Sequence, residues 1–368
     1  MKAKGDFGKY ILSVRGRYYE SEAGMRHEEF AEVYAERFVK LCLNEDVPKI
    51  RPSFTDQVDL GWLRELTGAL LAYSEDARYW VYDVGRYAGR LLAVKLEERG
   101  ILENFLQGRI KNSLGIFSMK RISDDDYRVQ VVENVFSYGL QNFGIRFDWF
   151  LAGVLGSLVS GVAGEPMGAR ELDCYASGAS SCTFQVRPVG TGARTEDKGQ
   201  PANWAQAVSA IAKEYLFRSQ VAEGRTRLRP TLGDGVDLSL LRLLYGVVFT
   251  YSPEVRTLLY AMGKKAGAMM GEAMPEQMKA MISSGDAAIR DQEGGFTVER
   301  KGENRFYFRI PECPAHGKPN IGEVAGYLEA GFGAGMFEAL LGKPVGAKEI
   351  MCPSKGDPEC VMELRVLE

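Results

Sequence analysis

Apolar side chains recur at helical spacing in the early part of the chain and alternate with polar ones later. Apolar residues that return every three or four positions predict helices over 25–43, 60–73, 75–98, 101–113 and the uncharged stretch 149–164. Alternating or short apolar runs predict strands over 116–120, 127–132, 167–174 and 182–187. Helices first and an antiparallel sheet afterwards predict an α+β fold, with the uncharged helix buried in close contact with its neighbours.

The second half of the chain repeats this order. Helices are predicted over 204–219, 238–249, 254–271 and 321–341, and strands over 296–300 and 306–310 before a last hairpin. Identical residues recur 178 positions apart, beginning with Arg51-Pro52 and Arg229-Pro230 and continuing through Asp56 and Asp234. The pattern predicts two copies of one domain rather than a solenoid, whose units are only about 20 to 50 residues long.

A polar segment separates the two copies. Residues 189–203 are rich in Gly and show no apolar periodicity, as is typical of an exposed linker. The sequence therefore predicts a first domain over 1–188, a linker over 189–203 and a second domain over 204–368.

Composition narrows the class of protein. Hydrophobic residues make up 45% and charged residues 26%, which suits ordinary globular cores, and the net charge of −3 comes without a Lys/Arg run. Nucleic acid is therefore not an expected partner, since phosphate binding relies on clustered positive charge. The beginning of the sequence lacks the apolar stretch of a secretory signal, and 149–164 is shorter than the roughly 20 residues of a bilayer span. We expect a cytoplasmic protein without a membrane span.

One cysteine motif occurs twice. Glu171-x-x-Cys174-x7-Cys182 recurs as Glu349-x-x-Cys352-x7-Cys360. A carboxylate and two thiols are a donor set that Zn²⁺ accepts, although a fourth ligand is still needed. Glu and Cys three apart on a regular strand would face opposite sides, so the strand has to end or bulge at the first cysteine. A disulfide or two small buried side chains are the alternatives, and recurrence of the glutamate favours zinc over both.

These residues also carry a family resemblance. The run from Asp148 to Gly153, Gly164 and the Glu/Cys motif resemble the 4-vinyl reductase type of small-molecule-binding domain. They are similar, too, to the ligand-sensing domain of bacterial activators that detect phenols and other aromatics. The resemblance implies a helical layer on an antiparallel sheet, a fold shared with nitric-oxide-sensing haem domains and TRAPP vesicle-tethering subunits.

The resemblance also implies a fourth zinc ligand. In the aromatic sensors, zinc is completed by a Cys that lies 23 residues before the Glu, where this chain has Asp148 in the first repeat and Gly326 in the second. Aspartate can bind zinc and glycine cannot. We therefore expect Asp148 to complete the first site, and Cys313 or His316 to complete the second.

An apolar ligand pocket between helices and sheet follows from the same resemblance. Ordinary core packing is the alternative role for the aromatic residues that we expect to line it, which are Tyr127, Tyr138, Trp149, Phe150, Tyr307, Tyr327 and Phe332. Tyr127 falls where the aromatic sensors place a ligand-contacting Trp, and its counterpart is Arg305, so the two pockets are expected to prefer different ligands.

Three functions are compatible with the sequence. The first is a zinc-containing protein that binds or senses a hydrophobic or aromatic small molecule. The second is an enzyme or accessory protein, in tetrapyrrole vinyl reduction or in zinc-assisted chemistry. The third is a dimerising scaffold, whose partner is a second copy or another protein. No Gly-x-Gly-x-x-Gly follows a predicted strand, which favours a binding protein over a reductase.

Overall fold

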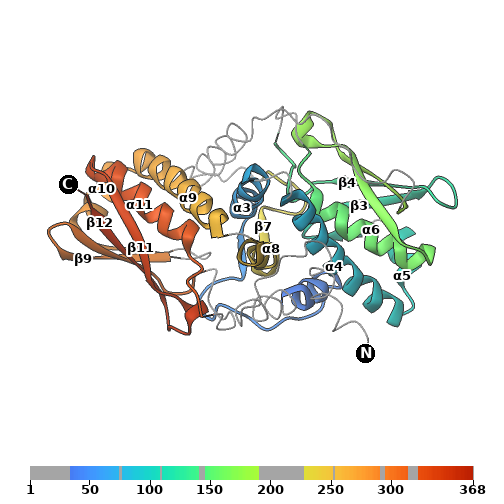
Figure 1. The fold of residues 1–368 in the computed structure, drawn as a ribbon, viewed down its shortest axis with the longest axis horizontal. Helices are drawn as coiled ribbons and strands as arrows, with labels where there is room; N and C mark the ends of the chain where they lie inside the picture. The colour runs from blue at the N-terminus through green and yellow to red at the C-terminus, as the bar shows by residue number, and fades with distance from the viewer. Residues whose placement is uncertain are drawn as a thin grey trace. The chain divides into compact units, whose positions relative to one another are not determined.

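The computed structural model describes residues 34–73, 77–107, 110–140, 146–189, 228–251, 253–290, 295–313 and 322–367. These residues form two compact units, each with helices and an antiparallel sheet (Figure 1), so the predicted α+β class is confirmed. Of the described residues, 34–47, 77–189 and 228–250 belong to the first unit, and 48–73 and 251–367 to the second. Over these ranges no helix combines the length and the apolar character that a membrane crossing requires.

The first unit is built on a five-stranded antiparallel sheet in the order β2-β3-β4-β6-β5. Its strands are β2 (Ile110–Asn112), β3 (Gly115–Arg121), β4 (Tyr127–Val132), β5 (Met167–Asp173) and β6 (Cys182–Pro188). Its helices include α4 (Ala77–Glu98), α5 (Leu102–Gln107), α6 (Trp149–Ala163) and α8 (Leu238–Tyr251). The helix predicted over 101–113 is wrong beyond residue 107, because residues 110–112 pair with β3 instead.

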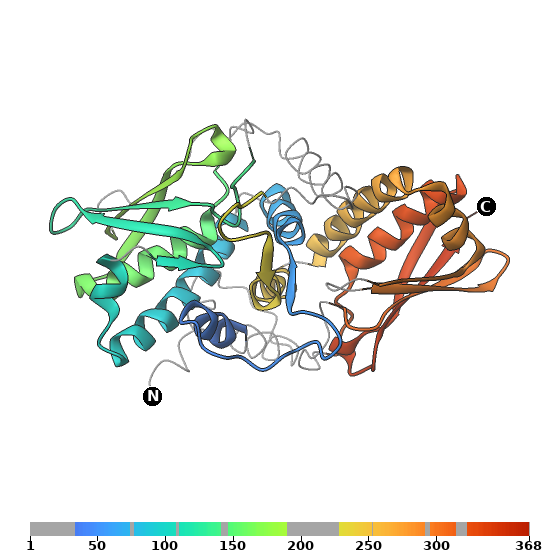
Figure 2. The ribbon, with the colours of Figure 1, turned by 180° about the vertical axis from the view of Figure 1, so that it is seen from behind.

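Helices α4 and α6 cover one face of this sheet (Figure 2) and pack closely against each other. Glycines make the approach possible. A Cβ atom at Gly153 would overlap the carbonyl oxygen of Tyr82, and one at Gly85 would overlap that of Phe150. The prediction of a buried, closely packed helix is thus confirmed, and it ends where predicted, at Gly164 in the left-handed conformation (φ 72°).

The second unit contains a five-stranded antiparallel sheet in the order β11-β12-β10-β9-β8. Its strands are β8 (Asp286–Arg290), β9 (Gly295–Gly302), β10 (Arg305–Ile310), β11 (Val345–Met351) and β12 (Cys360–Val366). Its helices include α3 (Leu60–Tyr73), α9 (Pro253–Ala273), α10 (Glu276–Ser284) and α11 (Tyr327–Leu341). Helix α10 and strand β8 were not predicted, and α11 begins at residue 327 rather than at 321.

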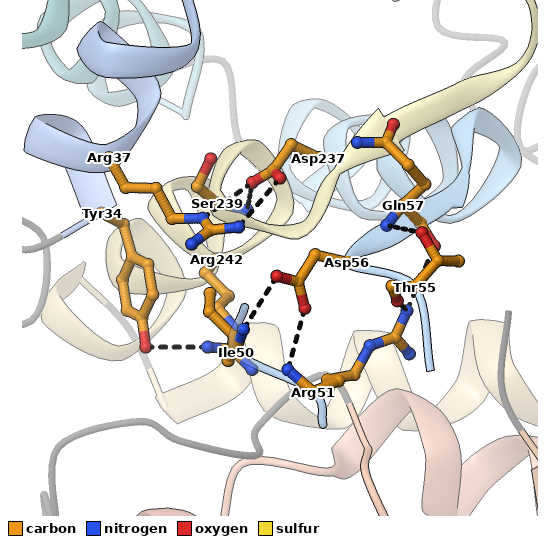
Figure 3. Close-up of polar contacts among 10 residues, drawn as sticks. All are labelled: Tyr34, Arg37, Ile50, Arg51, Thr55, Asp56, Gln57, Asp237, Ser239 and Arg242. Atoms are coloured by element: carbon orange, nitrogen blue, oxygen red, sulfur yellow. Dashed lines mark hydrogen bonds and ion pairs between the residues drawn. The ribbon is translucent and has the colours of Figure 1, made fainter. Parts of the chain in front are cut away.

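The elements recur at the spacing seen in the sequence. Each of α3, β4, α6, β5 and β6 has a counterpart of the same length 178 positions later, in α8, β10, α11, β11 and β12 respectively. A turn before α3 and α8 recurs as well. The carboxylate of Asp56 accepts hydrogen bonds from the backbone nitrogens of Ile50 and Arg51 at 2.8 and 2.9 Å (Figure 3). Asp234 does the same for Leu228 and Arg229 at 2.9 and 3.0 Å, so the repeated aspartate has a structural role. Short strands precede the two helices, β1 (Gln57–Asp59) and β7 (Gly235–Asp237).

Each unit contains a segment whose counterpart belongs to the other unit. Residues 228–250, from the second half of the sequence, lie in the first unit, and residues 48–73, from the first half, lie in the second. We call 48–73 and 228–250 the exchanged segments. In the first unit Glu133 accepts hydrogen bonds from the backbone nitrogens of Thr231 and Leu232 at 3.0 and 2.8 Å. In the second, Glu312 accepts one at 3.0 Å from Ser53, the counterpart of Thr231.

Buried charge fixes the exchanged segment of the first unit (Figure 3). Arg242 on α8 is fully buried and donates to the hydroxyl of Tyr34 at 3.0 Å, and Arg37 pairs with Asp237 at 3.2 Å. A buried guanidinium is tolerated only where its donors are satisfied, so these contacts define where α8 packs. The predicted boundaries at 188 and 204 remain a prediction, because residues 190–203 and the helix predicted over 204–219 lie outside the described residues.

Candidate functional site

Four acidic side chains meet in the interior of the first unit, where α6 begins. They are Asp148, Glu171, Cys174 and Cys182; all are buried, and their ligand atoms lie within 4.8 Å of one another. Asp148 precedes α6, Glu171 is on β5, and the two cysteines flank the hairpin that joins β5 to β6. We call these residues the first centre. The structure thus brings together the four metal ligands predicted for the first repeat.

A bulge places the glutamate and the first cysteine on the same side of the strand. The pairing of β5 with β6 shifts register between Glu171 and Asp173, and β5 ends at Asp173, directly before Cys174. The hairpin then turns through a short 3-10 helix (Tyr175–Ser177) closed by Gly178 at φ 96°, and Cys182 returns as the first residue of β6. The expectation that the strand ends or bulges at the first cysteine is confirmed.

The carboxylates of the first centre are not fully satisfied by the described residues. The hydroxyl of Ser137 donates to Asp148 Oδ2 at 2.8 Å, and the backbone nitrogen of Asp148 donates to Glu171 Oε2 at 3.3 Å. The other oxygens, Asp148 Oδ1 and Glu171 Oε1, are buried without a hydrogen-bond partner. Asp148 occupies the N-cap position of α6, yet its side chain makes no capping hydrogen bond. Burying acceptors in this way is costly unless a cation binds them.

Burial also opposes ionisation in this cluster. It is the main cause that raises the pKa of Glu171 well above its usual value, and the nearby Asp148 adds to the shift. Burial likewise raises the pKa of the Cys174 thiol, and that of Cys182 to about 11. A divalent cation would reverse the balance, because ligands bind a metal in their deprotonated forms. Two oxygen and two sulfur donors are a set that tetrahedral Zn²⁺ accepts.

The second repeat has the same local architecture with different contacts. Glu349 and Cys352 lie either side of an equivalent register shift between β11 and β12. The Cys360 thiol donates to Glu349 Oε1 at 2.8 Å, and the Cys352 sulfur lies 2.9 Å from the hydroxyl of Ser354. Cys313 is buried in the second unit, at 1% exposure, while His316 lies outside the described residues. All six cysteines of the chain are free, so neither motif is a disulfide.

The Glu349 carboxyl gives a pH-dependent expectation for the metal-free protein. Burial, followed by the charge of Cys352, raises the pKa of Glu349 from 4.5 to about 8. A carboxyl whose pKa is higher in the folded state holds its proton more tightly there, so folding stability falls as pH rises between these two values. We expect chelator-treated protein to lose stability over pH 4.5 to 8 more steeply than a Glu349→Gln variant does. Melting temperatures across this range measure the effect, with Glu97→Gln on the exposed side of α4 as control. Parallel curves for Glu349→Gln and the parent would contradict it.

An apolar pocket lies in the first unit between its helices and its sheet. Its lining comes from α4, α5, α6, the strands β2 to β4 and the neighbouring segments, and consists of Cys42, Leu92, Phe105, Asn112, Leu114, Phe117, Met119, Val129, Val154, Leu155 and Leu158. It encloses about 460 Å³ free of protein atoms, counting the part open to solvent. Burial raises the pKa of the Cys42 thiol to about 12, so this side chain is neutral.

The aromatic residues predicted to bind a ligand lie elsewhere than in this lining. In the first unit Phe150 packs at 5.7 Å between ring centroids against both Phe38 and Phe136, Tyr138 stacks edge-on against Tyr175 at 4.9 Å, and Tyr127 and Trp149 lie under Arg121 and Arg78. In the second unit Tyr307 lies beneath Lys301 and Arg309, Tyr327 beneath Arg256, and Phe332 against Trp62. Their role in binding stays a prediction.

The residues that do line the pocket were missed by sequence reasoning. Most are aliphatic or aromatic residues at ordinary core positions, which no local pattern distinguishes from a filled core. Cys42 was interpreted only as a buried thiol, which it is, at 4% exposure.

Comparison with known proteins bears on the second half of the chain. Residues 306–366 match the 4-vinyl reductase domain, as the resemblance led us to expect for this segment. The match covers β10, α11 and both strands of the last hairpin, and includes Cys313, Glu349, Cys352 and Cys360. The chain is also 26% identical over 137 residues to an uncharacterized protein, MJ0150, of Methanocaldococcus jannaschii. That alignment spans 37% of this chain and 79% of the relative, which is therefore much the shorter protein. The domain match associates the chain with small-molecule binding or sensing.

Proposed function

We propose that this protein binds or senses a small hydrophobic or aromatic molecule in the apolar pocket of the first unit, with zinc in the first centre as a structural ion. The observation that carries the proposal is that pocket and centre share one helix. Val154, Leu155 and Leu158 of α6 line the pocket, and Asp148 immediately precedes the same helix. At 1.5 Å per residue, Val154 lies only about 9 Å along the axis from Asp148.

The lining supports an apolar ligand. Apart from the neutral Cys42 thiol, Asn112 is the only polar residue among the lining residues, and its side-chain oxygen already accepts a hydrogen bond from the backbone nitrogen of Leu114 at 2.9 Å. A charged ligand would lose its hydration without gaining an ion pair. The enclosed space is within the roughly 300 to 1,000 Å³ of small-molecule sites.

The same lining favours binding over catalysis. General acid–base or nucleophilic chemistry needs a titratable group poised beside the ligand. Cys42 is the one titratable residue in the lining, and its pKa of about 12 keeps it protonated at neutral pH. The proposed role is therefore to hold a molecule, and the response passes through α6.

Zinc suits the first centre because of its charge and donor preference. It would link Asp148 at the start of α6 to Glu171, Cys174 and Cys182 around the β5–β6 hairpin. Bound there, it supplies positive charge to the two unpartnered carboxylate oxygens. Six free cysteines suit a reducing compartment, and we propose the cytoplasm. Recurrence of elements 178 positions apart likewise supports the inference of two tandem repeats of the 4-vinyl reductase type.

A matched pair of valine variants tests the pocket. Equilibrium dialysis of the full-length protein with naphthalene is expected to show saturable binding. Val154→Phe, which fills the pocket, is expected to weaken that binding at least tenfold, a loss of about 1.4 kcal/mol. Val94→Phe on α4, at a position 40% exposed and outside the lining, is expected to bind as the parent does.

Stability provides the second measurement for this test. Filling a cavity without strain leaves the melting temperature unchanged or higher, whereas overpacking lowers it. If Val154→Phe is unstable, Val154→Leu replaces it as a smaller intrusion. Naphthalene binding that is equal in parent and both pocket variants, or absent in the parent for naphthalene and toluene alike, would contradict the proposal.

A further inference from the structure

Cys313 lies next to the second Glu/Cys motif although it is remote from it in sequence. Strand β10 pairs with β12 so that Ile310 is opposite Cys360. Three residues beyond Ile310, the chain places Cys313 in the interior at 1% exposure. Its side chain hydrogen-bonds that of Cys360, and this bond is the largest cause that raises the pKa of Cys360. The Cys352 thiol is the next hydrogen-bonding neighbour of Cys360, and the Glu349 carboxylate lies 2.8 Å from its sulfur.

The fourth ligand of the second repeat cannot come from the start of α11. Gly326 stands where the first repeat has Asp148, and a Cβ atom there would lie 2.8 Å from Glu349 Oε1 and 3.0 Å from its carboxyl carbon. The backbone nitrogen of Gly326 donates to Glu349 Oε2 at 2.7 Å, which holds the carboxylate in this space. The Glu349 side chain thus fills the room that a ligand on residue 326 would need.

The segment after β4 and β10 approaches the motif in both units. In the first unit Ser137 of this segment hydrogen-bonds Asp148 and lies 3.1 Å from the Cys182 sulfur. Val135, the counterpart of Cys313, is fully buried and carries no donor atom on its side chain. The same stretch of backbone therefore supports the first centre with a hydroxyl, and presents a thiol only in the second unit.

We propose that Cys313, Glu349, Cys352 and Cys360 form a second metal centre, with three thiolates and one carboxylate, which prefers softer metal ions than the first centre does. This inference rests on the metal-binding role proposed for the first centre, because the shared motif has the same bulged geometry. Fully deprotonated, each set carries four negative charges, so charge does not distinguish them. The replacement of one carboxylate by a thiolate does, since sulfur ligands favour soft ions. Cadmium is expected to enter the second centre first, and cobalt to reveal the number of thiolates in each.

Cobalt-loaded full-length protein tests the donor set. Thiolate-to-cobalt charge-transfer absorption reports bound thiolates, of which two are expected in the first centre and three in the second. Cys313→Ser is expected to lower this absorption by about one-fifth or more and to weaken one of two cobalt sites. Cys313→Asp, which restores a ligand without a thiolate, is expected to recover the two-cobalt stoichiometry but not the absorption. Cys42→Ser is the control, because Cys42 lines the pocket of the first unit and leaves both donor sets intact.

Displacement by cadmium tests the preference. The first equivalent of Cd²⁺ is expected to remove about three-fifths of the charge-transfer absorption of the parent protein, and a smaller share of that of Cys313→Asp. Unchanged absorption in Cys313→Ser would overturn the assignment, as would a loss of cobalt in His316→Ala but not in the Cys313 variants. Failure of the first centre is distinguishable, because Cys174→Ser would then leave the cobalt count unchanged while the effect of Cys313→Ser persisted.

Discussion

Cys174→Ser is expected to destabilise the zinc-loaded protein by about 3 kcal/mol or more. The metal's binding free energy is part of the folding free energy, and removing one ligand leaves buried carboxylates without full compensation. Cys174 is fully buried among Asp148, Glu171 and Cys182. Cys352→Ser is expected to behave similarly, whereas Cys42→Ser, at a matched burial of 4%, is expected to cost less.

Thermal or urea denaturation with and without a chelator measures this effect. With zinc present, the Cys174→Ser and Cys352→Ser variants are expected to unfold well before Cys42→Ser. After chelation the difference between Cys174→Ser and the parent should largely disappear, because both then lack the ion. Equal midpoints for all three variants in zinc would argue against a structural ion at either centre.

Gly153→Ala and Gly331→Ala are expected to be the most damaging single-methyl changes in the chain. A Cβ at Gly153 would overlap the Tyr82 carbonyl oxygen, and one at Gly331 the Tyr260 carbonyl oxygen. Because the obstacle is backbone, the two helices have to separate, and the free energy of unfolding is expected to fall by about 3 kcal/mol or more. The alanine's higher helix propensity recovers only about 1 kcal/mol.

Gly302→Ala is the matched control, since a Cβ at this position of β9 would meet no atom within 4 Å. Urea denaturation of the three variants gives the comparison. A loss below about 1 kcal/mol in both helix variants would mean that α4 and α6, or α9 and α11, tolerate a wider spacing than the structure shows.

Much of the fold follows from residue patterns that local physics dictates. The boundaries of α3 agree with the apolar spacing over 60–73, and the uncharged stretch that became α6 ends at its glycine as expected. The Glu/Cys motif predicted a bulge because period-two alternation would otherwise separate its members. Asp148, Glu171, Cys174 and Cys182 do converge, so the composition of the first centre was predictable.

Other features could not be predicted from local patterns. Strand β2 is three residues long and α10 nine, too short for a periodicity to develop against neighbouring helices. The pocket depends on where side chains fail to fill space, which depends on packing rather than on residue type. The exchanged segments present a deeper problem. Since Ser53 and Thr231 belong to equivalent turns, each repeat offers the same contacts, and the sequence cannot indicate which copy a segment will complete.

The exchanged segments have a consequence for synthesis of the protein. A ribosome that has reached residue 203 has made the whole β2–β6 sheet with α4 and α6, yet not residues 228–250, which belong to that unit. Until then Glu133 lacks the backbone donors of Thr231 and Leu232, and Tyr34 lacks the guanidinium of Arg242. The nascent first unit therefore has to wait, with part of its interior exposed, for the middle of the message to be translated. Residues 48–73 wait longer still, since the sheet of their unit is completed only when β12 has been made.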